Sequence, residues 1–456
     1  MIHSDRQNIR KEVSKTLRIG GPVIIAQLLQ MSMNFVDTVM AGNLSAQDLA
    51  AIAVGGAIYF PFIMLAAGVL MALTPIVAQL LGARNFRDIG KNVRQGLWLS
   101  QLLALPIFFI IRNLGGIMPL LDVTSQIIPI ANGYLNAISW GVFPIFAYMA
   151  LRFFSEGLSI TRPGMYFALI GSLVNVPGNY VLMYGKLGLP ELGAVGCGYA
   201  SSIVALVMFI CMLSFTATFD SFKRFDLFHR FSLPEWSYLK EVLSVGIPIG
   251  ISSAMEVTMF AVVSLLMGTL STDAVAGHQI AINFSAMTFM VPLGLSTAIT
   301  TRVGNAAGAG SRSEVRKRGF LGVGMCVVFM ACTAIIMYLF PEFITGIYTD
   351  DQSVQSVAVG LIYMAAIFQI SDGLQVSGFG ALRGLKDTRT PMFVNLVSYW
   401  IIGVPLGYYL GITLQIGPQG LWMGLIAGLS IAGILHNYRF HYLTKRSSEP
   451  KWQKFR

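Results

Sequence analysis

Twelve long apolar segments follow one another along the chain, and each could cross a bilayer as a helix, which takes about 20 apolar residues. Only 11% of the residues are charged, whereas soluble domains have about 25%. We place the spans at residues 17–41, 48–72, 93–112, 127–151, 164–185, 195–217, 241–268, 276–301, 319–340, 354–382, 390–413 and 419–442. The sequence therefore predicts an all-α polytopic membrane protein with twelve transmembrane helices.

The lysines and arginines gather in alternate connections between these spans. When the N-terminus is placed inside, only Arg112 and Lys186 of the 31 basic residues fall in outer connections. Basic residues favour the cytoplasmic side of a membrane, so both termini are predicted to lie in the cytoplasm. The net charge of +10 then reflects loops that face anionic membrane lipid, and we predict no nucleic-acid partner.

The second half of the chain repeats the first. Ile19-Gly20-Gly21-Pro22 recurs as Val245-Gly246-Ile247-Pro248, and Gly42-Asn43-Leu44-Ser45 recurs as Gly268-Thr269-Leu270-Ser271. We predict two six-helix bundles, an N-terminal lobe at 1–217 and a C-terminal lobe at 241–456, joined by a cytoplasmic linker at 218–240. Because six is even, both lobes enter the membrane from the same side. This predicts a parallel tandem repeat with a pseudo-two-fold axis along the membrane normal.

The linker mixes charged residues with large apolar ones. The apolar members are Phe222, Phe225, Leu227, Phe228 and Phe231. Such a mixture is typical of a short amphipathic segment, and we expect it to lie on the membrane surface.

Three of the 21 acidic residues lie in the middle of predicted spans, namely Asp37, Glu256 and Asp372. A charge at the bilayer centre costs about 3 kcal/mol on insertion scales, and no basic residue lies mid-span to neutralise it. On a helical projection Asp37 shares an arc of about 80° with Gln27, Gln30 and Asn34. We therefore expect this face to line a water-accessible cavity in which Asp37 binds a cation.

Amide side chains recur at helical spacing in other spans. Asn175 and Asn179 lie one turn apart in the span 164–185, and Gln279 and Asn283 lie one turn apart in the span 276–301. Carboxylate and amide oxygens are suitable ligands for Na⁺, and a poorly solvated carboxyl group can instead hold a proton. Both ions stay open, with Na⁺ placed at Asp37 or at Glu256 and Asp372. The sequence offers no nucleophile, metal cluster or nucleotide-binding loop, so we predict neither an enzyme nor a cofactor beyond the ion.

Several motifs, taken in order, resemble one known family. They are Phe35-Val36-Asp37-Thr38-Val39-Met40-Ala41-Gly42, Pro75-Ile76-Val77-Ala78-Gln79, Glu191-Leu192-Gly193-Ala194-Val195-Gly196, Gly277-His278-Gln279-Ile280-Ala281-Ile282-Asn283 and Gly380-Ala381-Leu382-Arg383-Gly384. With them the chain resembles the MATE family of multidrug and toxin extrusion proteins, and within it the bacterial NorM-like branch. The resemblance implies a secondary active exporter of the bacterial inner membrane, working as a monomer by alternating access. It would exchange cationic and amphiphilic drugs for inward Na⁺ or H⁺.

The resemblance also implies roles for individual residues. It implies that Asp37, with Asn175 and Asn179, binds the coupling cation in the first lobe. In the second lobe the corresponding residues would be Glu256 and Asp372. Substrate contacts fall to Gln279, Asp350 and Asp351, and we add Gln30, Asn34 and Asn283. NorM-like relatives can carry a tyrosine shortly before the second-lobe acid, where this chain has Phe368. The alternative function is a flippase for a lipid-linked precursor, which would need basic residues in its cavity.

Overall fold

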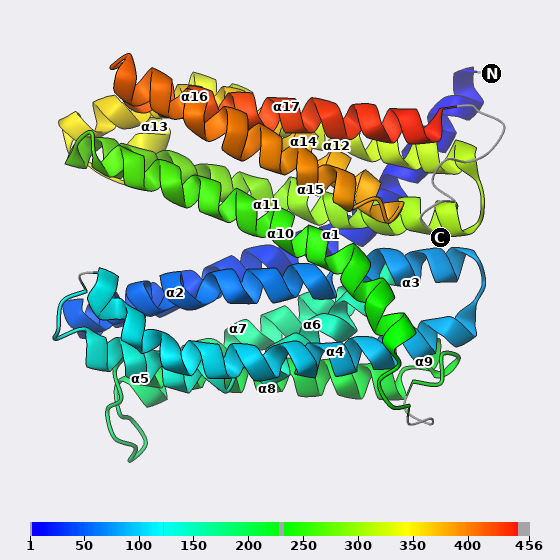
Figure 1. Ribbon diagram of the computed structural model, residues 1–456, viewed down its shortest axis with the longest axis horizontal. Coiled ribbons are helices and arrows are strands. Elements are labelled where there is room, and N and C mark those ends of the chain that lie inside the picture. Colours follow the sequence, from blue (N-terminus) through cyan, green and yellow to red (C-terminus); the bar gives the residue numbers. More distant parts are fainter. Residues whose placement is uncertain (1, 122, 228–231, 446–456) are drawn as a thin grey trace. The chain divides into compact units, whose positions relative to one another are not determined.

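The computed structural model describes residues 2–121, 123–227 and 232–445, and these are almost entirely helical, with no strand among them (Figure 1). The elements are α1 Ile2–Leu44, α2 Ala46–Leu70, α3 Leu73–Gly82, α4 Phe86–Asn113, η1 Leu114–Leu121, α5 Ile128–Ser139, α6 Val142–Gly157, α7 Arg162–Met183, α8 Ala194–Thr218, α9 Asp220–Lys223, α10 Trp236–Gly268, α11 Thr272–Gly308, α12 Arg312–Leu339, α13 Pro341–Gly346, α14 Gln352–Gly384, α15 Arg389–Asn395, η2 Leu396–Gly403, α16 Val404–Tyr408, η3 Tyr409–Thr413 and α17 Pro418–Thr444. The element η1 is a 3₁₀ helix, whereas η2 and η3 are π-helical.

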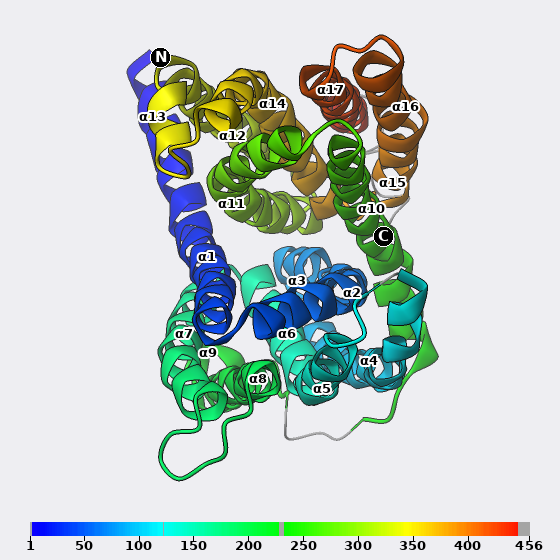
Figure 2. The same cartoon turned by 90° about the vertical axis from the view of Figure 1, so that its left-hand side faces the viewer.

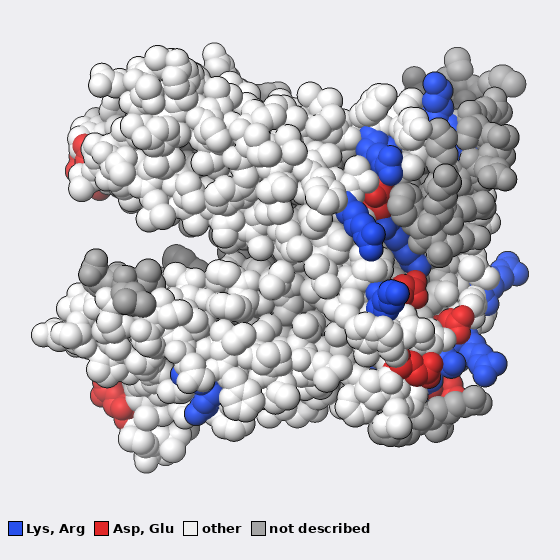
Figure 3. All heavy atoms as spheres, in the orientation of Figure 1, with Lys and Arg blue, Asp and Glu red and all other residues white. Residues whose placement is uncertain are grey.

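Eleven stretches in the described residues are helical, long and apolar enough to span a membrane. A twelfth span results if α5 and α6, which meet at a bend of 46°, are counted as one. Figure 3 shows a broad surface without charged residues in each unit, with most lysines and arginines near one end of the helices. The chain is thus an all-α polytopic membrane protein, as the apolar segments predict.

By its contacts the chain divides into two compact units. The first unit is residues 25–250, and the second unit is residues 1–24 with 251–456. In the first unit α8 packs beside α5, α6 and α7, and in the second unit α14 packs beside α11, α12 and α17 (Figure 2). The start of α1 therefore packs with the second unit, and the start of α10 packs with the first.

Close backbone approach holds the start of α10 in the first unit. Gly250 lies against α2, and a side chain on Gly68 would collide with the backbone of Gly250. On the second unit, Gly294 lies equally close to Ile24 of α1. Glycine allows such backbone contacts because it carries no Cβ.

A buried ion pair fastens the start of α1 within the second unit. The Arg302 guanidinium donates to the Glu12 carboxylate, the Glu12 carbonyl oxygen and the Thr16 hydroxyl. Arg318 approaches Glu12 at 3.9 Å and donates to Glu314 at 3.0 Å. Lys15 Nζ donates to the other Glu12 oxygen at 3.1 Å. Glu12 and Arg302 are only 4% and 5% exposed, so protein groups rather than water solvate both charges.

The linker differs from the prediction. Phe222 and Phe225 are buried in the core of the first unit, where both rings contact Phe154, so they do not lie on the membrane surface. Leu227 belongs to the same core cluster, whereas Phe228 and Phe231 lie outside the described residues. The prediction failed because a sequence pattern cannot distinguish lipid from a protein core as the apolar partner.

We predict that Arg302→Met destabilises the protein by about 1–3 kcal/mol, because the buried Glu12 carboxylate loses its main donor and keeps, among the described residues, only Lys15 at 3.1 Å and Arg318 at 3.9 Å. The melting temperature of the detergent-solubilised protein should fall clearly. The double variant Glu12→Gln with Arg302→Met should recover most of the loss. As a control, Lys223→Ala removes the exposed pair with Asp220 and should change little. An unchanged melting temperature for Arg302→Met would contradict the prediction.

Candidate functional site

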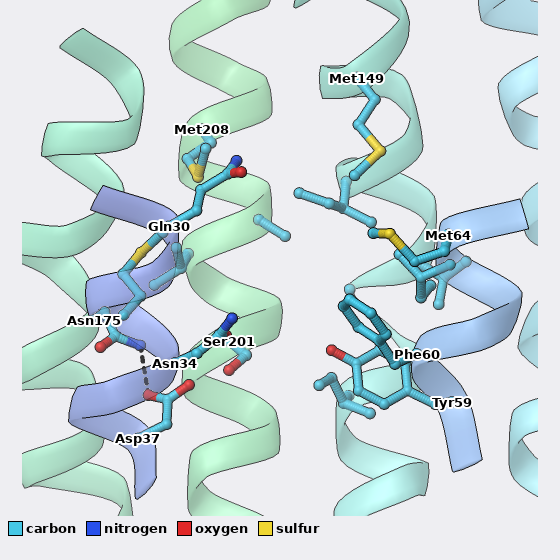
Figure 4. A pocket seen from close by; sticks show the side chains of 18 residues that line it. Gln30, Asn34, Asp37, Tyr59, Phe60, Met64, Met149, Asn175, Ser201 and Met208 are labelled. Carbon is cyan, nitrogen blue, oxygen red and sulfur yellow. Dashed lines mark hydrogen bonds between the residues drawn. The ribbon is translucent and has the colours of Figure 1, made fainter. Parts of the chain in front are cut away.

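Asp37 lies in α1 of the first unit and is held by two amides from α7. Asn175 Nδ2 donates to Asp37 Oδ1 at 2.9 Å (Figure 4). Asn179 Nδ2 donates to the same oxygen at 2.5 Å. The two asparagines stand one turn apart, so they present their amides on one face of α7. Pro177 lies between them and has no N–H, which leaves a backbone carbonyl one turn earlier without its helical donor.

Asp37 lines a cavity of about 210 Å³ in the first unit. Gln30 and Asn34 extend the polar side along α1, while Tyr59 and Met64 of α2 lie across from them (Figure 4). The Asn179 carbonyl oxygen is buried and has no hydrogen-bond partner among the described residues. The lining thus combines carboxylate and amide oxygens with a large apolar wall, a combination that suits a small cation or an amphiphilic cation.

Glu256 of α10 and Asp372 of α14 share a second cavity, of about 260 Å³, in the second unit. The remaining lining is mostly apolar and aromatic: Val257, Phe260, Ile282, Ser285, Ala286, Phe289 and Phe368. The two carboxyl groups are close enough to interact electrostatically. In the described part of the chain, Asp372 Oδ1 and the Ser285 hydroxyl have no hydrogen-bond partner. Because buried polar atoms are normally paired, these oxygens are available to a ligand or to water.

A third cavity, of about 390 Å³, opens where α11 meets the segment before α14. Gln279, Asn283 and Asp351 line it, and the Tyr348 hydroxyl donates to Asn283 Oδ1 at 3.1 Å. Hydrogen bonds from the Ser353 side chain and backbone N–H hold the pKa of Asp351 below its ordinary value. Asp351 therefore carries a full negative charge at neutral pH. Asp350 is exposed and is not among the lining residues.

The structure thus gathers the predicted residues into three places. The first cavity is lined by Gln30, Asn34, Asp37 and Asn175, and Asn179 is bonded to Asp37. The second is lined by Glu256 and Asp372, and the third by Gln279, Asn283 and Asp351. Sequence reasoning missed Tyr59, Ser285 and Tyr348. A polar group inside an apolar span is the signal that could have found Tyr59 and Ser285. Tyr348 could have been found as an aromatic neighbour of the Asp350-Asp351 pair.

Three comparisons with known proteins bear on these cavities. The MatE family model matches twice, over residues 22–181 and 248–409, so each half of the chain carries one copy. A "Multidrug resistance protein MdtK" of Edwardsiella ictaluri (strain 93-146) is 41% identical over 445 residues, covering 96% of this chain and 97% of the relative. A protein of the same name from Yersinia enterocolitica is 42% identical over 442 residues, with 96% and 97% covered.

Solved structures share the fold at lower identity. The eukaryotic MATE transporter AtDTX14 matches with a TM-score of 0.88 at 18% identity, over 98% of this chain and 99% of that one. An outward-facing MATE family transporter of the MOP superfamily matches with a TM-score of 0.86 at 18% identity, over 94% and 95%. The family model covers both halves and the relatives match almost end to end; the chain therefore belongs to the MatE family of membrane transporters.

Proposed function

We propose that this protein exports cationic and amphiphilic drugs from the bacterial cytoplasm in exchange for inward Na⁺ or H⁺. Both relatives are named as multidrug resistance proteins, which supports multidrug export. The observation that supports ion coupling is the cavity of Glu256 and Asp372, where a half-buried and a buried carboxyl group face each other without a basic partner among the described lining. The protein would sit in the inner membrane as a monomer, with both termini in the cytoplasm.

Competition for the carboxyl groups would couple the two movements. A lipophilic cation binds while Asp37, Glu256 and Asp372 are ionised, and Na⁺ or H⁺ lowers its affinity by neutralising one of them. Linkage makes the effect reciprocal, so the drug must weaken ion binding by the same factor. The membrane potential contributes about 2.3 kcal/mol per inward charge per 100 mV, which favours ion entry. It opposes the exit of a cationic drug by the same amount per charge, so the inward ion movement must drive that exit.

A lipid-linked precursor flippase is a weaker candidate. Such a substrate carries phosphate, which is usually recognised by lysine or arginine. Neither residue is among the described lining of the first and second cavities, whereas acidic residues line both. The charge of the two cavities therefore supports a cationic substrate.

We predict that Asp372→Asn, Glu256→Gln and Asp37→Asn each reduce ion-driven efflux of an ethidium-like dye by at least about tenfold, which corresponds to a barrier about 1.4 kcal/mol higher. The substitutions keep the size of each side chain and remove its charge, so membrane insertion should be unchanged. Efflux would be measured in proteoliposomes under a Na⁺ gradient or a pH gradient, each applied alone. The gradient that drives wild-type export identifies the coupling ion.

Glu342→Gln provides the matched control, because Glu342 is an exposed acid at the start of α13. It should export at the wild-type rate. Wild-type rates for all three cavity variants would refute ion coupling at these acids. Wild-type protein that exports dye under neither gradient would refute antiport itself.

We predict that Asp351→Asn raises the KM for a cationic dye by about two- to fivefold, as expected for an exposed charge pair. The KM for a neutral drug should not change. Because the pKa of Asp351 is lowered, its carboxylate stays ionised from pH 6 to pH 8. The KM ratio of variant to wild type should therefore be constant across this range, measured by dye efflux. An equal effect on neutral and cationic drugs would contradict a role for the charge.

A further inference from the structure

The second unit contains a row of buried polar groups between Asp372 and the ends of α14 and α17. Each is at most 4% exposed. In the described residues no hydrogen-bond partner is found for Asp372 Oδ1, Gln375 Oε1, both amide atoms of Asn395, the Ser398 and Tyr399 hydroxyls and His436 Nε2. So many unpaired polar atoms in one core are unusual, since almost all such atoms are normally satisfied.

The row begins at the ion cavity. The Tyr399 side chain lies close enough to Asp372 and Glu256 to interact electrostatically, and its hydroxyl faces the Gln375 amide. Trp400, the next residue, donates to the Met255 carbonyl at 3.3 Å. This bond ties η2 to α10 beside the ion cavity. The π-helical turns of η2 carry both Ser398 and Tyr399, and such turns occur often at functional sites.

The row continues through His436 of α17. His436 Nδ1 lies 3.4 Å from the Gln375 carbonyl oxygen. The Pro391 carbonyl also lies near the ring, and Asp387 interacts with it electrostatically, but Nε2 has no partner within hydrogen-bond geometry among the described residues. Asn395 stands one turn beyond Pro391 on the same face of α15. Asp387 then accepts from Arg439 at 2.8 Å, and the Arg439 side chain is 29% exposed.

The residues of the row also lie progressively closer to the C-terminal ends of α14 and α17. At about 1.5 Å per residue, Asp372 lies about 18 Å and Gln375 about 14 Å from the end of α14, while His436 lies about 12 Å from the end of α17. Both ends belong to the side that the basic residues place in the cytoplasm. The row thus spans the distance from mid-membrane to that surface.

Another buried histidine shows that this core can satisfy an imidazole. His278 Nε2 lies 2.8 Å from the Ser264 hydroxyl, and Trp422 Nε1 donates to His278 Nδ1 at 3.2 Å. Both ring nitrogens of His278 are therefore used. A buried histidine in this unit can therefore have both nitrogens bonded, and the lack of a partner at His436 Nε2 reflects the residues around His436.

The first unit lacks such a row at the equivalent positions. The halves can be aligned here because Gly157 and Gly384 face the carbonyl oxygens of Thr74 and Thr300, and because Gly193 and Gly417 both have positive φ before α8 and α17. Gln375, Asn395 and His436 then correspond to Tyr148, Phe167 and Met212, which pack together in the core of the first unit. The one polar group among these three, the Tyr148 hydroxyl, donates to the Gly164 carbonyl at 3.5 Å. The shared fold can therefore satisfy these positions, and the unpaired atoms of the second unit require another explanation.

We propose that this row is a hydrated route along which the coupling cation passes between Asp372 and the cytoplasm. Water would bond to the unpaired atoms, because buried water occupies sites with several polar partners. A proton could move along the Tyr399 hydroxyl, bound water and His436 Nε2, and Na⁺ could move between the hydroxyl and amide oxygens. The route rests on the proposed function, since it requires that Asp372 binds the coupling ion.

The test separates the rate of ion passage from ion affinity. His436→Leu and Asn395→Leu replace polar groups of the route by apolar ones, and His436→Gln keeps hydrogen-bonding capacity. Ser430→Ala is the matched control, because Ser430 bonds Ser371 at 2.7 Å between the same two helices outside the row. Dye efflux from proteoliposomes is measured under whichever gradient drives the wild type. Ion-induced release of bound dye from detergent-solubilised protein is measured at equilibrium, with Asp372→Asn as reference.

Both leucine variants should slow efflux by about tenfold, as a higher barrier to passage requires. Their half-effective ion concentration at equilibrium should stay within about twofold of wild type, a difference below about 0.5 kcal/mol. Ser430→Ala should behave nearly as wild type. His436→Gln should do so if Na⁺ is the coupling ion, and should slow efflux like His436→Leu if H⁺ is, because an amide cannot relay a proton. If Asp372→Asn still releases dye in response to the ion, the proposed coupling site is wrong. Suppose instead that Asp372→Asn loses the response to the ion. The route is then wrong, and the coupling site stands, if the leucine variants export at the wild-type rate or if they too lose the equilibrium response.

Discussion

The bilayer core contains no water, and this constrains where polar atoms can lie in the structure. Every polar atom at membrane depth must find a partner inside the protein, face water or bind a ligand. Most of the chain meets this demand with helices whose side chains are apolar. The exceptions are therefore informative, and they fall into two kinds. Asp37 is bonded by two amides of another helix, whereas Asp372, Ser285 and Asn179 keep atoms without a partner among the described residues.

The two halves use one fold for different chemistry. In the first unit the Asp37 carboxylate accepts two amide N–H groups, which satisfy its negative charge without a cation. In the second unit Asp372 has no such donor on Oδ1 and faces a second carboxyl group, Glu256. Under the proposed function, the first arrangement suits an acid that attracts a lipophilic cation, and the second suits two acids that share a small one. The two halves thus have one fold and different polar residues at their cavities.

Much of this organisation could be predicted from the sequence because the membrane imposes strong rules. Apolar segments predict the helices, and acids without basic partners predict two of the cavities. Other features depend on the tertiary partner of a residue, which no local pattern encodes. The burial of Phe222 against Phe154 is one case, because lipid and a protein core select the same side chains. The pairing of Glu12 with Arg302 is another case. The two residues lie far apart in the chain, and the sequence around either one does not indicate the contact.

Asymmetry between the halves also bears on the direction of transport. A carrier must release its ion on the side opposite to the one where the ion entered, so the ion site needs access to the cytoplasm at some stage. In the first unit Tyr148, Phe167 and Met212 pack in one core, and the Tyr148 hydroxyl is satisfied by a backbone carbonyl. The second unit fills the matching positions with Gln375, Asn395 and His436, each of which keeps at least one buried polar atom without a hydrogen-bond partner among the described residues. If the ion leaves through one half alone, drug and ion need not share an exit. The competition between them is then confined to binding, where linkage requires it to be reciprocal.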